Sequence, residues 1–233
     1  MLTRMLRIAV PSMIQQSIVS MGMLFVQALV NSFGSVVVAG YTAATKIDSI
    51  AMLPMLNISN AVSSFTAQNI GAGRPERVRK GYRAALVMTA VIALVITGCL
   101  YLFGANFMSL FVDANLSQGV IDVGVEYLRV VSVFYILMGG MFSTNGLLRG
   151  SGDVKAFMTS TLCNFVCRVT CAYAFASLMG ASSIWWSIPM GWGVGLTISF
   201  LRYRSGKWAN KSLVQDERKP VREAAEAGAQ EIE

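Results

Sequence analysis

The chain has 233 residues, of which 55% are hydrophobic and only 13% are charged. Soluble domains carry about 25% charged residues, so this composition predicts a membrane protein. Histidine, the commonest acid–base and metal-binding side chain, is absent from the chain. The net charge of +7 gathers between long apolar runs, whereas a nucleic-acid binder would spread its cations over one folded face.

Six apolar stretches are long enough to cross a bilayer, which takes about 20 residues. Hydrocarbon offers no hydrogen-bond partner to the backbone, so these stretches predict helices. The expected spans are residues 8–30, 36–70, 84–103, 130–148, 156–178 and 184–201. We therefore expect an all-α, polytopic membrane protein, with one six-helix lobe over residues 1–208 and a charged cytoplasmic tail over 209–233.

The basic residues orient these spans, because Lys and Arg favour the cytoplasmic side of short loops. Sixteen of the 19 basic residues lie before span one or after spans two, four and six. The other connections, residues 31–35, 104–127 and 179–183, contain neither Lys nor Arg. The pattern predicts a multi-pass protein of the inner or plasma membrane with both termini in the cytoplasm.

Prolines with neighbouring amide side chains occur in spans one and two. Pro11 precedes Gln15, and Pro54 precedes Asn57 and Asn60. A proline inside a helix removes a hydrogen bond and favours a kink. The freed carbonyls and the amides can coordinate an ion or a drug, or they can satisfy the kink and bond across helices. Both interpretations stay open for these residues.

Two ionisable residues, Lys46 and Asp48, lie inside span two. Ionisable groups within a membrane are costly and are candidates for a functional role. In one interpretation Asp48 attracts a cationic substrate or a coupling ion. In the other, both residues lie near the outer interface and Lys46 extends toward water.

Span two is expected to end at the stretch from Gly71 to Pro75, because Gly favours a helix C-terminus. The basic run that follows, to Arg83, is expected to form a cytoplasmic loop. The letters "GAG" do not make a dinucleotide-binding fingerprint, since the third glycine is missing and no strand precedes them.

Spans four to six carry further candidates. Met138 either lines an apolar cleft, because Met adapts to varied shapes, or faces the lipid; both interpretations stay open. Arg168, with Asn164 one turn before it, is expected to have a structural role between helices. Cys163, Cys167 and Cys171 and the GxxxG pattern of span six suggest close helix packing, not a metal site.

Four segments carry a family resemblance. They are "AVPSMI", "NSFGSVVVAGYTAATKIDSIAMLPMLNISNAVSSFTAQNIGAG", "GLLRGSGD" and "WWSIPMGWGVGLTISFLRYRSGKW". The chain resembles the second half of a transporter of the MATE family, the multidrug and toxic-compound efflux proteins. The resemblance implies two six-helix lobes around a cleft and export of organic cations in exchange for H+ or Na+. It implies no cofactor beyond the coupling ion.

The chain is about half as long as a family member, and three explanations compete. It is a fragment, it pairs with a separate N-terminal lobe, or it assembles with a second copy of itself; we favour the fragment. One family subgroup places coupling carboxylates in spans one and four of this lobe, and those spans have no acid here. The resemblance then implies a coupling carboxylate in the missing lobe.

Two other functions remain as alternatives. A non-transporting regulatory or scaffold membrane protein is one. A membrane-embedded enzyme is the other, but it needs a nucleophile with a base, a carboxylate pair or a metal cluster. The spans contain a lone Asp and no histidine, so we expect no catalytic residues, no metal site and no nucleic-acid partner.

Overall fold

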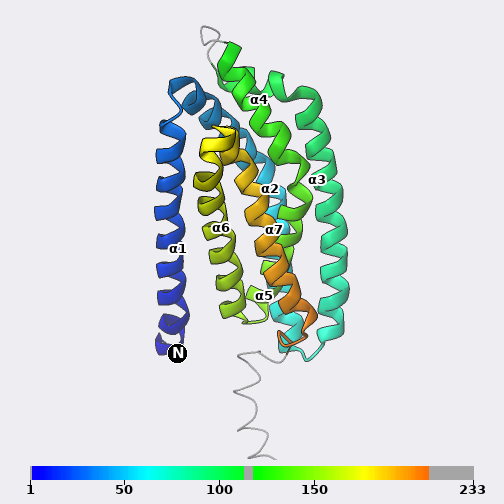
Figure 1. Ribbon diagram of the computed structural model, residues 1–233. Coiled ribbons are helices and arrows are strands. Elements are labelled where there is room, and N and C mark those ends of the chain that lie inside the picture. Colours follow the sequence, from blue (N-terminus) through cyan, green and yellow to red (C-terminus); the bar gives the residue numbers. More distant parts are fainter. Residues whose placement is uncertain (1, 113–117, 210–233) are drawn as a thin grey trace, which may run out of the picture.

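The computed structural model describes residues 2–112 and 118–209, with side chains in the first helix from residue 16 onward and at residue 13. The described part forms a bundle of seven helices without strands (Figure 1). The helices are α1 (Leu2–Asn31), α2 (Ser35–Gly71), α3 (Pro75–Phe111), α4 (Gln118–Val133), α5 (Tyr135–Gly150), α6 (Val154–Met179) and α7 (Ser182–Arg204). The all-α prediction is confirmed.

Four of these helices, α2, α3, α6 and α7, are long and apolar enough to cross a membrane. The helices α2 and α3 have 37 residues each, so at 1.5 Å per residue they exceed the thickness of a bilayer core. The expected tail from residue 210 onward lies outside the described residues.

The prediction that α2 ends near Gly71 is confirmed. Gly73 has a φ of +70°, a conformation that favours glycine, and Arg74 N–H donates to the carbonyl of Asn69 at 2.8 Å. The expected basic loop is wrong, because α3 starts at once with Pro75 at its first position. Pro is well suited to that position, since its missing N–H has no partner in the first turn.

The expected fourth span is also different from the structure, which has two helices there. The predicted outer connection 104–127 is largely helical, and the helix that starts at Gln118 is interrupted at Phe134. Phe134 has φ −96° and ψ 8°, the sparsely populated bridge region. Its N–H bonds to the carbonyl of Val131, three residues back, so one tight turn separates α4 from α5. Composition alone gives no sign of such a break.

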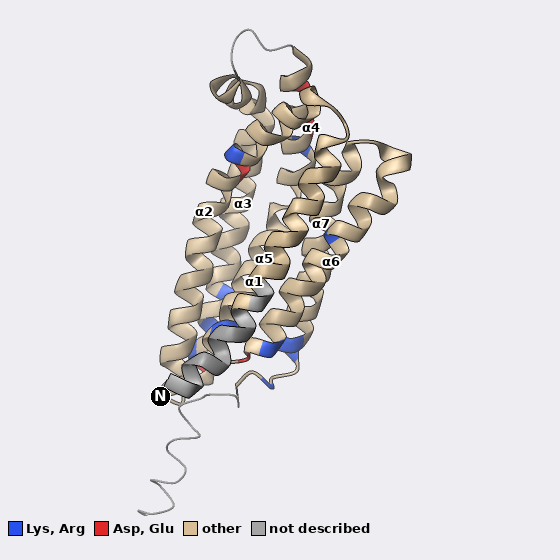
Figure 2. Ribbon diagram, turned by 90° about the vertical axis from the view of Figure 1, so that its left-hand side faces the viewer, with Lys and Arg blue, Asp and Glu red and all other residues tan. Residues whose placement is uncertain are grey.

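Most of the Lys and Arg residues gather at one end of the bundle, and a few lie farther along it (Figure 2). The chain reverses direction along the bundle with each span, so the α2–α3 and α5–α6 turns and the end of α7 lie together with the N-terminus (Figure 1). The separation of charge expected from the sequence therefore exists in space.

The close packing expected of the GxxxG pattern is confirmed between α6 and α7. A Cβ atom at Gly191 would lie 2.5 Å from Asn164 Oδ1 and 2.7 Å from the Asn164 carbonyl oxygen. A Cβ atom at Gly195 would lie 3.0 Å from Asn164 Cβ and 3.4 Å from the carbonyl of Ser160. Glycine lets the two backbones approach, as small residues do at helix interfaces in membranes.

Candidate functional site

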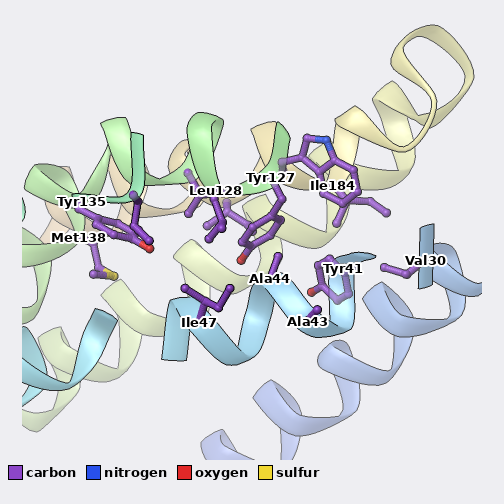
Figure 3. Packing of buried hydrophobic residues seen from close by; sticks show 14 of the residues in the cluster. Val30, Tyr41, Ala43, Ala44, Ile47, Tyr127, Leu128, Tyr135, Met138 and Ile184 are labelled. Atoms are coloured by element: carbon purple, nitrogen blue, oxygen red, sulfur yellow. The ribbon is translucent and has the colours of Figure 1, made fainter. Parts of the chain in front are cut away.

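The carboxylate of Asp48 lies inside the lobe, and the residue is only 6% exposed. Tyr127 donates its hydroxyl to Asp48 Oδ2 at 3.0 Å, and Tyr135 donates to Oδ1 at 2.5 Å. Both tyrosine rings point toward α2, with the Tyr127 oxygen near Ile47 and the Tyr135 oxygen near Met138 (Figure 3). A buried ionised group needs hydrogen bonds to offset its lost hydration, and the two phenols supply them.

The two tyrosines come from opposite sides of the helix break. Tyr127 belongs to α4, and Tyr135 is the first residue of α5. The Phe134 carbonyl between them accepts from Leu137 N–H at 2.9 Å and from Met138 N–H at 3.3 Å. One carboxylate of α2 thus holds both halves of a divided span.

Aromatic rings enclose the Tyr127 side of the site. Tyr127 meets Tyr41 edge-on, with ring centroids 5.6 Å apart, and Trp185 at 5.7 Å. Tyr41 and Trp185 are stacked at 6.1 Å. These rings are bulky and excluded from water, so the hydrogen bonds to Asp48 act in a low local dielectric, where they are strong.

The cation Arg168 lies within electrostatic reach of Asp48. Arg168 sits on α6 beside Asn164, and its Cβ would lie 3.3 Å from a Cβ at Gly191 of α7. Its Nε is buried and has no hydrogen-bond partner among the described residues. Asn164 and Arg168 thus lie at the α6–α7 contact.

The other candidates on α2 are exposed, whereas Asp48 is buried. Lys46, Pro54 and Asn57 are exposed on α2. The helix α2 continues through Pro54. Asn60 accepts a bond from Arg149 Nη2 at 2.8 Å and so links α2 to the end of α5. Met138 is fully buried in the core that also contains Tyr135 (Figure 3).

Two candidates in α1 cannot be placed beside the others. Pro11 lies within α1, but its side chain and that of Gln15 fall outside the described side chains. The ion or drug contacts predicted for these two residues stay predictions.

Tyr127 and Tyr135 are not among the site residues predicted from the sequence. They are eight positions apart in the sequence, and a continuous helix would turn them to sides about 80° apart at 100° per residue. The break at Phe134 changes this angle between the directions of the two side chains. The available signal was weak: buried tyrosine hydroxyls usually have a partner, and Asp48 is an obvious acceptor in a span.

Known proteins resemble this chain over most of its length. The family model described as MatE matches residues 11–174. A probable multidrug resistance protein of Bacillus subtilis (strain 168), YpnP, is 29% identical over 209 residues, which are 89% of this chain and 46% of the relative. A second from the same strain, YoeA, is 25% identical over 92% of this chain and 46% of its own length.

Solved structures agree with the sequence matches. The inward-facing conformation of a multidrug resistance MATE family transporter of the MOP superfamily has a TM-score of 0.80 and 25% identity, over 91% of this chain and 49% of that one. An outward-facing structure with the same description gives 0.78 and 25%, over 88% and 47%. The chain thus spans about half the length of the curated relatives it matches. The family model covers most of the chain, and the chain belongs to the MatE family.

Proposed function

We propose that this chain is one lobe of a secondary antiporter that exports organic cations in exchange for H+ or Na+, with both termini in the cytoplasm. The multidrug relatives and the half-length match support a transporter lobe. The observation that carries the coupling proposal is Asp48, a buried carboxylate bonded to both halves of a broken span. In this proposal Asp48 is a coupling group of this lobe, beside any carboxylate in the missing one.

The chemistry of Asp48 suits reversible binding of a cation. An ionised carboxylate accepts hydrogen bonds only, whereas a protonated one also donates. Protonation of Asp48 therefore weakens at least one of the two tyrosine bonds. Na+ would act similarly, because carboxylate and hydroxyl oxygens are suitable ligands for a hard cation and the phenols would have to turn their protons away.

The break at Phe134 gives this exchange a mechanical consequence. With Asp48 ionised, Tyr127 and Tyr135 are both held to α2. Once the cation binds and a bond weakens, α4 and α5 can change their angle at the tight turn. Small changes at a site become large movements when the element they bias has two arrangements.

An organic cation would bind outside this buried site. Asp48 is enclosed by the lobe, whereas α1 and α2 expose large apolar side chains such as Leu24, Phe25, Ile50 and Leu53. These exposed faces suit a cleft shared with a second lobe. That lobe is the missing N-terminal half or a second copy of this chain.

Transport in proteoliposomes tests the proposal. The chain is assembled with the lobe that completes it, and proton or Na+ flux driven by an organic cation is measured. We expect Asp48→Asn to reduce exchange at least tenfold, while the exposed α4 acid in the Asp122→Asn control leaves it unchanged. Full exchange by Asp48→Asn would exclude Asp48 as a coupling group, and no flux from the parent assembly would contradict a transporter.

A further inference from the structure

We propose that a pocket between the start of α6 and the end of α7 binds the headgroup of an anionic phospholipid. The pocket has a volume of about 500 Å³. It lies at the end of the bundle where the Lys and Arg residues gather (Figure 2). Its position therefore places it where the bundle passes from hydrocarbon to the headgroup layer.

The pocket is electropositive. Three cationic side chains line it, Lys155, Arg202 and Lys207, together with one carboxylate, Asp153. Three positive charges and one negative charge leave a net charge of +2. Arg202 Nε lies 2.5 Å from Asp153 Oδ2, and the Asp153 side chain is 1% exposed. This ion pair fixes the floor of the pocket, while Lys155 and Lys207 are exposed and can approach a phosphate.

The pocket also has an apolar wall on its membrane side. Ile198 and Leu201 line it from α7, and Leu201 is 62% exposed. They precede Arg202 along α7, which runs toward the basic end (Figure 1), and Lys207 follows the end of that helix. The lining therefore changes from apolar to cationic in the direction in which a phospholipid changes from acyl chain to headgroup.

The start of α6 adds a further attraction for phosphate. Asp153 occupies the cap position but makes no side-chain cap hydrogen bond, since its carboxylate bonds to Arg202. The Asp153 carboxylate therefore does not occupy the first N–H groups of α6 with a side-chain hydrogen bond. Such helix starts favour phosphate, and here this effect adds to that of the two lysines.

A phospholipid accounts for both the cationic lining and the apolar wall of the pocket, whereas a soluble anion accounts only for the cationic lining. A free phosphate would use the lysines and the helix start and leave Ile198 and Leu201 without a role. Basic pockets between transmembrane helices are suited to acidic headgroups, and each nearby Lys or Arg raises the affinity about fivefold. We therefore assign the pocket to an anionic phospholipid.

Native mass spectrometry of the purified chain in detergent tests this assignment. The probes are phosphatidylglycerol, phosphatidylcholine and soluble glycerol phosphate. The test variant is Lys155→Gln with Lys207→Gln. The matched control is Lys80→Gln with Arg83→Gln, which removes two exposed cations of α3 at the same end of the bundle. Both double variants should keep the helical circular dichroism of the parent chain.

We expect tight binding of phosphatidylglycerol that phosphatidylcholine does not match. The Lys155→Gln, Lys207→Gln variant should bind about thirtyfold more weakly, the factor for two lost cations, and the control should bind normally. A second variant, Leu201→Ser, should weaken lipid binding without a change of charge. Equal losses in test and control, no preference over phosphatidylcholine, or full displacement by glycerol phosphate would overturn the proposal.

Discussion

The hydroxyl of Tyr135 donates a 2.5 Å hydrogen bond to Oδ1 of Asp48, 87 positions away in the sequence. The bond joins the first residue of α5 to the middle of α2. Tyr127 completes the arrangement from the last turns of α4. The polar centre of the lobe is therefore also the point at which its divided span is held together.

Removal of either phenol hydroxyl should destabilise the lobe and disturb the Asp48 site. Hydrogen bonds to charged groups contribute about 1.5–3 kcal/mol, so Tyr127→Phe and Tyr135→Phe should each lower the free energy of unfolding by about that amount. Thermal unfolding in detergent measures the change. The control is Tyr101→Phe, whose ring is 55% exposed.

A functional readout separates this role from simple packing. If the tyrosines hold the Asp48 carboxylate, Tyr135→Phe should shift the pH profile of exchange in the assembled transporter, whereas Tyr101→Phe should not. If Tyr127→Phe and Tyr135→Phe both match the parent in unfolding and in pH profile, the hydrogen bonds to Asp48 contribute neither to stability nor to exchange.

Addition of one methyl group at Gly191 should separate α6 from α7. The new Cβ would lie 2.5 Å from Asn164 Oδ1 and 2.7 Å from the Asn164 backbone oxygen. A backbone oxygen can move away only if helix α6 itself shifts. Overpacking typically costs about 1–3 kcal/mol, so Gly191→Ala should lower the melting temperature measured by fluorescence-detected size exclusion.

Gly193 provides the control for this substitution on the same helix. A Cβ at Gly193 meets no atom within 4 Å, so Gly193→Ala should leave the melting temperature unchanged or raise it slightly, because Ala favours helices. Equal melting temperatures for the two variants would contradict the close contact at Gly191.

The contact between Arg149 and Asn60 should show a small but measurable coupling. Arg149 Nη2 donates to Asn60 Oδ1 at 2.8 Å, and its Nε approaches Ser63 Oγ at 3.4 Å. Polar contacts between transmembrane helices average about 0.6 kcal/mol. A double-mutant cycle of Arg149→Gln and Asn60→Ala, followed by chemical unfolding, should give a coupling of that size.

Two other outcomes would change the interpretation of the contact between Arg149 and Asn60. A coupling near zero would mean that water competes fully for Arg149 at the basic end. Normal stability combined with slow exchange in Asn60→Ala would favour the ion- or drug-binding role that the sequence analysis left open for this amide.

The helical class of the chain could be predicted because it depends on local composition. Apolar runs of bilayer length must be helical, since hydrocarbon leaves the backbone no other partner. The charge asymmetry and the GxxxG pattern could likewise be recognised in the sequence, because each depends on residue type and short spacing alone. The spans around α1, α2, α3, α6 and α7 were located for these reasons.

The break at Phe134 and the basic first turns of α3 could not be predicted from the same signals. Phe134 is neither Pro nor Gly, so nothing in its type marks a tight turn. The basic run from Arg77 to Arg83 is compatible with a loop and with a helix. In the structure it is helical, with Pro75 at the first position of α3.

By itself the sequence determined the membrane class, the positions of the long apolar runs, and the single isolated acid in span two. Only the tertiary structure decided what that acid contacts. Asp48 meets Tyr127 and Tyr135 because two helices pack beside α2 and a turn between them sets both phenols toward one carboxylate. Hydropathy measures how a segment partitions between water and lipid, whereas this contact depends on the rotation of three helices about their axes.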